Sequence, residues 1–490
     1  MKLKTTLLGA VAVSALISTA AHAQDVPAEV TLFKDVNIFD GVNEEMLEGY
    51  DVLVVENLIR EIAEDIPTEG TYELEVTTGE LQRVEALPGS GVNGYTVTIL
   101  DADGIQTETQ EVAVNVIDGQ GRTLMPGLID THYHLMLAAS EGDAWRLEQP
   151  DYTHATMVLE ANRLLQRGFT TIRDTAGPGF GIKKAVDAGM IPGPRMYLSG
   201  TLITQTSGHA DRTLPFEEPR IFSGGVPVGE SVMKLDRVAN GRAEVLAAVR
   251  QNLKQGATQI KIAVGGGIYS LYDPLDVTEF TVEEIEAAVQ AASDWGTYVT
   301  SHVYTPKGVL RAVNAGMKTI EHGQLMNDEA AKAMADKGVY LITQPFEPQP
   351  QLEAIADPIQ YGKYTQVVEG WARTVELLKK HNVKMGFGTD LVFSPGTNHE
   401  QADYLARFGT WFSNVEMLRM ITSTNAEIVA LSGPRNPYQE GPLGVIEAGA
   451  YADIILVDGN PMEDITVLGD NGVKIELVMK DGQIFKNTME

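Results

Sequence analysis

From about Met125 to Ser432 the sequence repeats one pattern: a short apolar, β-branched segment, a polar or glycine-rich loop, and an amphipathic stretch. The amphipathic stretches include residues 241–255 and 328–338, and Gly256 and Gly338 stand where helix C-terminal signals belong. Eight strands alternating with helices predict an α/β protein with a (β/α)8 TIM barrel. The eight strand-like segments are LMPGLID, FTTIRD, RMYLSG, TQIKIAV, TYVTSHV, KTIEH, VYLIT and VKMGFGTD.

The two ends of the chain have a different pattern. Residues 30–60 and 450–487 are rich in strand-like segments, which we expect to pair into one small β-sandwich. Residues 66–115 look like an insertion, with turn signals at Thr78-Gly79 and Asp103-Gly104. The expected parts are a signal peptide (1–23), the first part of the sandwich (24–124, with the insertion 66–115), the barrel (125–433) and the rest of the sandwich (434–490).

The first residues have the features of a secretory signal. Lys2 and Lys4 precede an apolar run from Leu7 to Ile17, and Ala21-His22-Ala23 forms a small-x-small cleavage site. The run is too short to span a membrane permanently. We therefore expect export to the bacterial periplasm or medium, with a mature chain that begins at Gln24.

Composition excludes several classes of site and partner. The chain has no cysteine, which rules out disulfides, thiolate metal sites and a cysteine nucleophile. Its net charge of −30 repels phosphate backbones and anionic lipid, so we expect neither nucleic acid nor a membrane as a partner. The expected partner is a small-molecule or short-peptide substrate, and whether the chain forms a homo-oligomer stays open.

The ends of the predicted strands carry an unusual set of side chains. In a (β/α)8 barrel catalytic residues lie at the C-terminal ends of the strands. His132 and His134 end the first strand and, two residues apart on an extended chain, point the same way. The full set of such side chains is His132, His134, Lys261, His302, His322 and Asp390, on strands 1, 4, 5, 6 and 8. Any one of them could have a structural role, but their occurrence together predicts a metal site.

The donor types indicate which metal and how many ions. Four imidazoles and a carboxylate suit zinc or a similar divalent ion, and they are too many for one tetrahedral ion with an open position. They suit two ions if another group bridges them. Lys261 lies in an otherwise apolar strand, where an unpaired ammonium is costly. A carbamate formed from Lys261 and CO₂ would supply a bridging carboxylate.

This arrangement resembles the amidohydrolase superfamily, with HxH after strand 1, lysine on strand 4, histidines on strands 5 and 6 and aspartate on strand 8. Five segments resemble its imidazolonepropionase-like branch, which includes metal-dependent Xaa-Pro dipeptidases, carboxypeptidases and amidases. They are LMPGLIDTHYH, TTIRDTAG, SHVYTPKGV, IEHG and residues 449–453. The resemblance covers residues 30–64 and 115–487. Residues 66–115 depart from the usual pattern but lie outside every motif.

The resemblance implies a role for each ligand. His132, His134 and Asp390 would hold the first ion, His302 and His322 the second, and carbamylated Lys261 would bridge both. A metal-bridging hydroxide would attack the substrate carbonyl. Asp390 would take the proton of the attacking water and deliver it to the leaving amine.

Further residues near these strand ends are candidates for contact with substrate. Tyr304 shares the face of His302 and could donate to the carbonyl or to a substrate carboxylate, or it could only pack. His209 lies in the loop after strand 3, which touches substrate in relatives. Arg212 could bind an anionic group or remain solvated. Arg173 and Asp174 could form an ion pair or support the ligands, and Gly265-Gly266-Gly267 predicts a backbone bend near the metals.

The sequence thus predicts an exported binuclear-metal amidohydrolase that cleaves the amide bond to a C-terminal amino acid in dipeptides or N-acyl amino acids. A lactonase or a cyclic-amide hydrolase of the same superfamily is the alternative. Two other classes stay open at this point. Lys261 could form a Schiff base, as in lyases, or the chain could be an exported binding protein.

Overall fold

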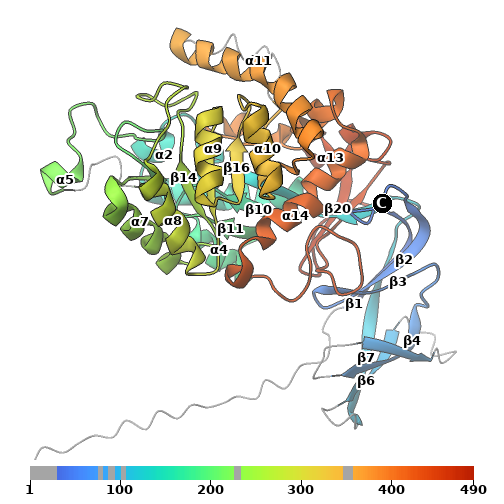
Figure 1. Cartoon of the computed structure of the whole chain (residues 1–490). Helices are drawn as coiled ribbons and strands as arrows, with labels where there is room; N and C mark the ends of the chain where they lie inside the picture. The colour runs from blue at the N-terminus through green and yellow to red at the C-terminus, as the bar shows by residue number, and fades with distance from the viewer. Residues whose placement is uncertain are drawn as a thin grey trace, which may run out of the picture. The chain divides into compact units, whose positions relative to one another are not determined.

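The computed structural model describes residues 30–75, 81–85, 94–100, 106–225, 233–345 and 357–489 (Figure 1). The predicted signal peptide lies outside these residues. Backbone contacts separate two compact units among them. One is Pro67–Val114, and the other combines Val30–Ile66 with the chain from Asn115 onward.

The smaller unit is a set of paired strands. Strands β4 (Glu69–Glu75) and β5 (Leu81–Glu85) pair antiparallel, as do β6 (Gly94–Leu100) and β7 (Gln106–Asp118). Strands β4 and β6 pair in parallel. The predicted turns at Thr78-Gly79 and Asp103-Gly104 lie outside the described residues.

All eight predicted strands of the repeating pattern are present in the larger unit, and they pair in parallel. The pairs form two sheets, in the orders β11-β10-β9 and β13-β12-β14-β15-β16-β17-β18. The eight are β9 (Leu128–Tyr133), β10 (Phe169–Asp174), β11 (Arg195–Leu198), β14 (Ile260–Ala263), β15 (Val299–Val303), β16 (Thr319–His322), β17 (Tyr340–Thr343) and β18 (Met385–Phe387). The structure adds two short strands, β12 (Leu202–Thr204) and β13 (Asp236–Val238).

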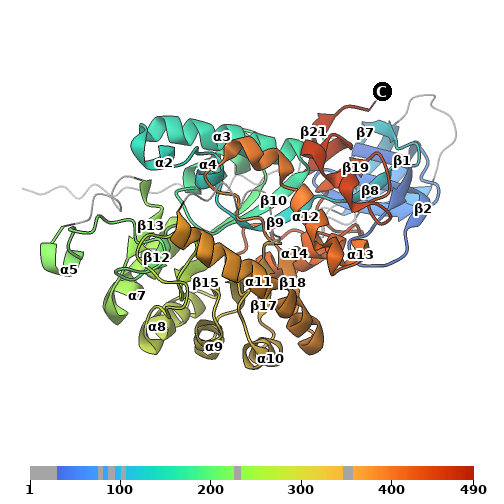
Figure 2. The ribbon, with the colours of Figure 1, turned by 90° about the horizontal axis from the view of Figure 1, so that it is seen from above.

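Helices flank these strands. Figure 2 shows α7 to α10 along one side of the parallel strands and α3 and α4 along the other. Gly256 ends α7 in the left-handed conformation, and Gly338 takes the same conformation after α10, as the sequence predicts. The longer helices are α3 (Pro150–Gln166), α4 (Phe180–Asp187), α7 (Gly241–Gln255), α8 (Val282–Ser293), α9 (Pro306–Ala315), α10 (Asp328–Asp336), α11 (Pro358–His381), α13 (Asn414–Ile421) and α14 (Ser423–Ala430). The short ones include α1 (Leu135–Ala138), α2 (Ala144–Leu147), α5 (Arg220–Ser223) and α12 (Asp403–Ala406).

The two ends of the chain meet in one sheet, as the sequence predicts. Its strands run in the order β21-β20-β19-β8-β1, with β2 beside β1 and β3 beside β2. They are β1 (Val30–Ile38), β2 (Leu47–Val55), β3 (Leu58–Ala63), β8 (Thr123–Pro126), β19 (Ile454–Val457), β20 (Ile475–Lys480) and β21 (Gln483–Asn487). The predicted segment LMPGLID is therefore divided, since its first residues belong to β8 and its last to β9.

Most of the parallel strands are buried along their whole length, so any polar group on them is removed from water. Every residue of β9, β10, β14, β15 and β16 is buried. Parallel sheets in α/β proteins are covered on both faces, so this burial is expected. Within the described part of the chain, no helix is both long and apolar enough to cross a membrane.

Candidate metal site

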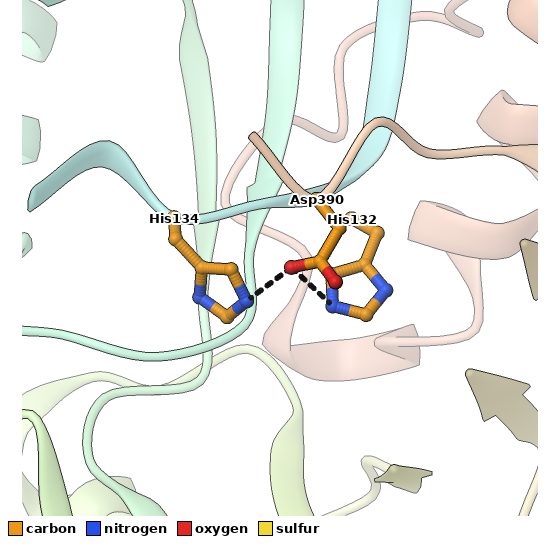
Figure 3. Close-up of side chains that lie close together, drawn as sticks. All are labelled: His132, His134 and Asp390. Carbon is orange, nitrogen blue, oxygen red and sulfur yellow. Dashed lines mark ion pairs between the residues drawn. The ribbon is translucent and has the colours of Figure 1, made fainter. Parts of the chain in front are cut away.

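His132, His134 and Asp390 converge on one point (Figure 3). Asp390 Oδ1 lies 3.6 Å from His132 Nε2 and 3.1 Å from His134 Nε2. Two ligands held about 2.0–2.1 Å from a tetrahedral zinc ion would be roughly 3.3 Å apart, which lies between these separations. Two imidazoles and a carboxylate are also the donor types that zinc takes. The donor set therefore fits a divalent ion.

The backbone at this point is held in an uncommon conformation. Asp390 has φ of 53° and His322 has φ of 77°, in the left-handed region that residues other than glycine seldom adopt. The Asp390 backbone N–H donates to the His132 carbonyl at 2.8 Å. Strain of this kind persists where the surrounding contacts determine it, and it clusters at functional sites.

Asp130, which the sequence did not single out, ties these two segments together. Its Oδ1 accepts from the backbone N–H of His132 at 3.0 Å and of Thr389 at 3.2 Å. Its Oδ2 accepts from the Thr389 hydroxyl at 2.6 Å and from Gln401 at 2.9 Å. Asp130 thus fixes His132 and the residue before Asp390 relative to each other.

Lys261 is buried on β14 beside His132. Its Nζ lies 3.5 Å from His132 Nε2, and within the described part of the chain it forms no ion pair. Burial lowers the pKa of Lys261 to about 8. Lys261 therefore loses its proton at a lower pH than a solvated lysine does.

His302 and His322 lie beside the first cluster on neighbouring strands. Their ring centroids are 4.3 Å apart, and the His322 ring is 5.0 Å from the His132 ring. His322 Nδ1 lies 3.0 Å from Gln344 Oε1, and His302 Nε2 lies 3.3 Å from the Gly266 carbonyl. The structure thus brings all six predicted ligand residues to the wall of one cavity. Among them, His132, His134 and Asp390 form a group of three whose donor atoms all lie within 4.8 Å of one another.

A buried ion pair contacts His132 at Nδ1. Glu321 Oε1 lies 2.6 Å from Arg173 Nη2, and Glu321 Oε2 lies 2.8 Å from His132 Nδ1. A carboxylate at Nδ1 places the proton there and leaves the lone pair on Nε2, which faces Asp390 and Lys261. Of the two roles predicted for Arg173 and Asp174, the ion pair between them is wrong, because Asp174 accepts from two backbone N–H groups. Arg173 instead has the supporting role, since it pairs with the carboxylate that contacts His132.

The electrostatics of the site keep the imidazoles of His132, His302 and His322 neutral and the Asp390 carboxylate charged. Burial lowers the pKa of His132 to about 4 and lowers the pKa values of His302 and His322 well below the ordinary value. Burial alone would raise the pKa of the Asp390 carboxyl, but His132 and His134 beside it hold it below its ordinary value. Neutral imidazoles and ionised carboxylates are the forms that bind metal.

The cavity has a volume of about 970 Å³ including its open mouth, and Tyr304 forms part of its wall. The Tyr304 ring stacks against His322 with centroids 4.9 Å apart and meets the His302 ring edge-on at 5.2 Å. Burial raises the pKa of the Tyr304 hydroxyl, so this group keeps its proton and can donate.

His209 also lines the cavity and packs directly on a predicted ligand. Its ring stacks on His302 with centroids 3.6 Å apart and planes 8° apart. Its Nδ1 lies 3.0 Å from the Ser270 hydroxyl. A Cβ on Gly267 would lie 2.1 Å from His209 Nδ1, so only glycine fits there, in the predicted bend of residues 265–267.

Arg212 is held against the cavity wall. Its Nε lies 3.1 Å from Asp236 Oδ2, and its guanidinium carbon lies 5.1 Å from the Trp145 ring and 5.8 Å from the Phe393 ring. Its side chain is 28% exposed. The guanidinium is therefore positioned by contacts and still faces the cavity.

Comparisons with known proteins agree with this geometry. Residues 123–485 match the Amidohydrolase family. The chain is 29% identical to the ochratoxinase of Aspergillus niger over 394 residues, which cover 74% of this chain and 75% of that protein. It is 24% identical to the imidazolonepropionase of Idiomarina loihiensis over 388 residues, 72% of this chain and 81% of that one. A crystal structure of a prolidase complexed with N-methylphosphonate-L-proline matches with a TM-score of 0.77 and 30% identity, over 94% of this chain and 100% of the other.

Proposed function

Since this chain belongs to the amidohydrolase family and is a hydrolase of carbon–nitrogen bonds, we propose that it cleaves the amide bond to a C-terminal amino acid in dipeptides or N-acyl amino acids. One observation carries the proposal. His132, His134 and Asp390 converge in a cavity whose wall also holds Tyr304 and Arg212, two side chains able to bind a carboxylate.

We propose that two divalent ions, zinc in the first instance, complete the site. His132, His134 and Asp390 would hold one, and His302 and His322 the other. Bound ions of this type polarise a carbonyl and lower the pKa of water. The four imidazoles are buried, those of His132, His302 and His322 have pKa values below the ordinary one, and Asp390 lies partly exposed beside them, which supports this assignment.

We propose that Lys261 bridges the ions as a carbamate. The uncharged amine would form a bond to the carbon of CO₂ and release a proton, which gives a negatively charged carboxylate at the end of the side chain. The burial of Lys261 without a carboxylate partner, 3.5 Å from His132 Nε2, supports this.

The side chains of the site divide the chemical work. Asp390, ionised beside His132 and His134, takes a proton from water as its oxygen adds to the carbonyl carbon, and delivers that proton to the leaving nitrogen as the C–N bond breaks. Tyr304 donates a hydrogen bond to the scissile carbonyl or to the substrate carboxylate. Amide and water are thus converted to a carboxylic acid and an amine, with no side-chain nucleophile.

We assign the binding of the substrate carboxylate to His209, Tyr304 and Arg212. The prolidase neighbour was crystallised with an N-substituted L-proline, which carries such a carboxylate. Holding the carboxylate places the amide over the metal ligands, and orientation of this kind lowers the barrier by several kcal/mol.

The test compares dipeptides and N-acyl amino acids with their C-terminal amides on zinc-loaded enzyme. Loss of the carboxylate should lower kcat/KM by roughly tenfold or more, because a hydrogen bond to a charged group is worth about 1.5–3 kcal/mol. Equal rates on acid and amide would remove the carboxylate site. A preference for lactones or cyclic amides over every peptide would identify the alternative member of the superfamily.

Two further features belong to the proposal. We propose that the parallel strands close into the (β/α)8 barrel and that the sheet of the chain ends folds as a β-sandwich beside it, at the domain boundaries expected above. The two parallel sheets and the separate apolar core of Phe33, Ile38, Val54, Leu456 and Leu477 support this. We also propose export. Protein recovered from its native host should begin at Gln24, and a mature protein that retains Met1 would contradict export.

A further inference from the structure

The loop Gly267–Asp273, between β14 and α8, places two large apolar side chains in the cavity wall while leaving them open to solvent. Tyr269 is 51% exposed and Leu271 is 72% exposed. We propose that this loop contacts the side chain of the C-terminal residue of the substrate, and that Tyr269 and Leu271 select a large apolar or aromatic side chain there. This inference rests on the proposed function and narrows its substrate class.

The loop is fixed by buried polar groups. Asp273 Oδ2 accepts from the backbone N–H of Gly267 and from the Ser270 hydroxyl, both at 2.6 Å. Lys363, buried on α11, donates from Nζ to the Gly267 carbonyl at 2.9 Å and to the Asp273 carbonyl at 2.7 Å. One ammonium thus holds both ends of the loop, so Tyr269 and Leu271 are presented on an ordered backbone.

The position of the loop determines which part of the substrate it meets. Ser270, between Tyr269 and Leu271, lies 3.0 Å from His209 Nδ1 through its hydroxyl. The proposed function places the substrate carboxylate at His209. The side chain nearest to that carboxylate is the one on the same α-carbon, so the loop meets the side chain of the C-terminal residue.

The rest of the wall makes an apolar side chain favourable. The cavity is also lined by a set of buried or partly buried apolar residues: Leu137, Leu202, Leu235, Ile268, Val392 and Phe393. Apolar surface removed from water contributes about fourfold in binding for each methylene that is fully buried. A substrate with a C-terminal leucine or phenylalanine should therefore bind more tightly than one with glycine or alanine.

Two matched surface residues serve as controls. Leu147 on α2 is 75% exposed and Tyr152 on α3 is 58% exposed, close to the values of the loop residues, and neither lines the cavity. Leu271→Ser and Leu147→Ser thus make the same chemical change at similar exposure, as do Tyr269→Ser and Tyr152→Ser. A difference within a pair reports contact with substrate and not surface polarity.

The experiment measures kcat/KM of the zinc-loaded holoenzyme and the four variants on N-acetyl derivatives of glycine, alanine, leucine and phenylalanine. The wild type should prefer leucine and phenylalanine over alanine by about tenfold or more, and Leu271→Ser and Tyr269→Ser should each lower that ratio roughly tenfold. The control variants should keep the ratio. Hydrolysis with a ratio unchanged by both loop variants would overturn this inference alone, whereas hydrolysis of none of the four compounds, and of no dipeptide that ends in the same four residues, would overturn the proposed function and this inference with it.

Discussion

Replacing Glu321 by glutamine tests whether this carboxylate positions His132 for metal binding, apart from its contribution to the stability of the protein. Glu321 and Arg173 are both fully buried, 2.6 Å apart, and the other Glu321 oxygen lies 2.8 Å from His132 Nδ1. Glutamine has the same shape but no charge. It can accept from Arg173 with its oxygen, and its amide N–H₂ then faces the imidazole.

Two effects of different size follow from this geometry. Removing the charge from one member of a buried ion pair costs about 3–5 kcal/mol, and we expect the lower end because the amide oxygen still accepts from Arg173. An amide donor at Nδ1 also favours the tautomer with its proton on Nε2, the nitrogen that faces Asp390. Loss of such support lowers metal affinity by about 10–100-fold.

The assay compares zinc affinity, by competition with a chelator, and the midpoint of thermal unfolding. The control is Asp453→Asn, because Asp453, directly before β19, forms a second buried pair with Arg195 at 2.8 Å, and neither residue lines the cavity. Both variants should unfold at lower temperature, and only Glu321→Gln should lose zinc affinity. Equal zinc affinity in the two variants would refute the role of Glu321 at His132.

Three other changes test separate features of the site. Lys261→Ala should be inactive and partly rescued by short carboxylic acids, and Lys261→Arg should be inactive, since guanidinium cannot form the bridge; full activity of either would refute the carbamate. Burial raises the pKa of Glu279 to about 9, so the folded protein holds a proton there that the unfolded chain releases above about 4.5. As pH rises from about 4.5 to about 9, the free energy of unfolding should therefore fall by up to about 1.4 kcal/mol per pH unit. Between pH 6 and pH 8, denaturant unfolding should show a smaller fall for Glu279→Gln than for the wild type. Lys363→Met should raise KM more than it lowers kcat, with recovery in Lys363→Arg, whereas Lys380→Met, at the exposed end of the same helix, should change neither.

The sequence predicted that the six proposed ligand residues come together because each lies on a parallel strand or shortly after one. Hydrophobic periodicity locates strands, and parallel strands present their C-terminal ends at one edge of the sheet. His302 and His322 end β15 and β16, and the register pairs Ala263 with His302 and Val303 with His322. The order of the strands along the chain was therefore enough to predict that these side chains lie close together.

The supporting contacts could not be predicted in the same way. Arg173 and Asp174 are neighbours in the chain, and side chains of neighbouring strand residues point to opposite faces, so they cannot pair. Arg173 instead pairs with Glu321, from a strand that is not adjacent to its own. Lys363 reaches the loop at Gly267 from a helix almost a hundred residues further along the chain. Periodicity carries no information about such contacts.

Two of the proposed ligand residues receive support from groups on other strands. Glu321 precedes His322 in β16 but contacts His132 in β9, and Asp130 in β9 holds Thr389, the neighbour of Asp390. His132 and Asp390 are thus each positioned in part by a group from another strand. Because buried polar networks couple their members, removal of one supporting group should disturb ligands on other strands too. The left-handed backbone of His322 and Asp390 fits this view, since strain at single residues persists only where several segments determine it together.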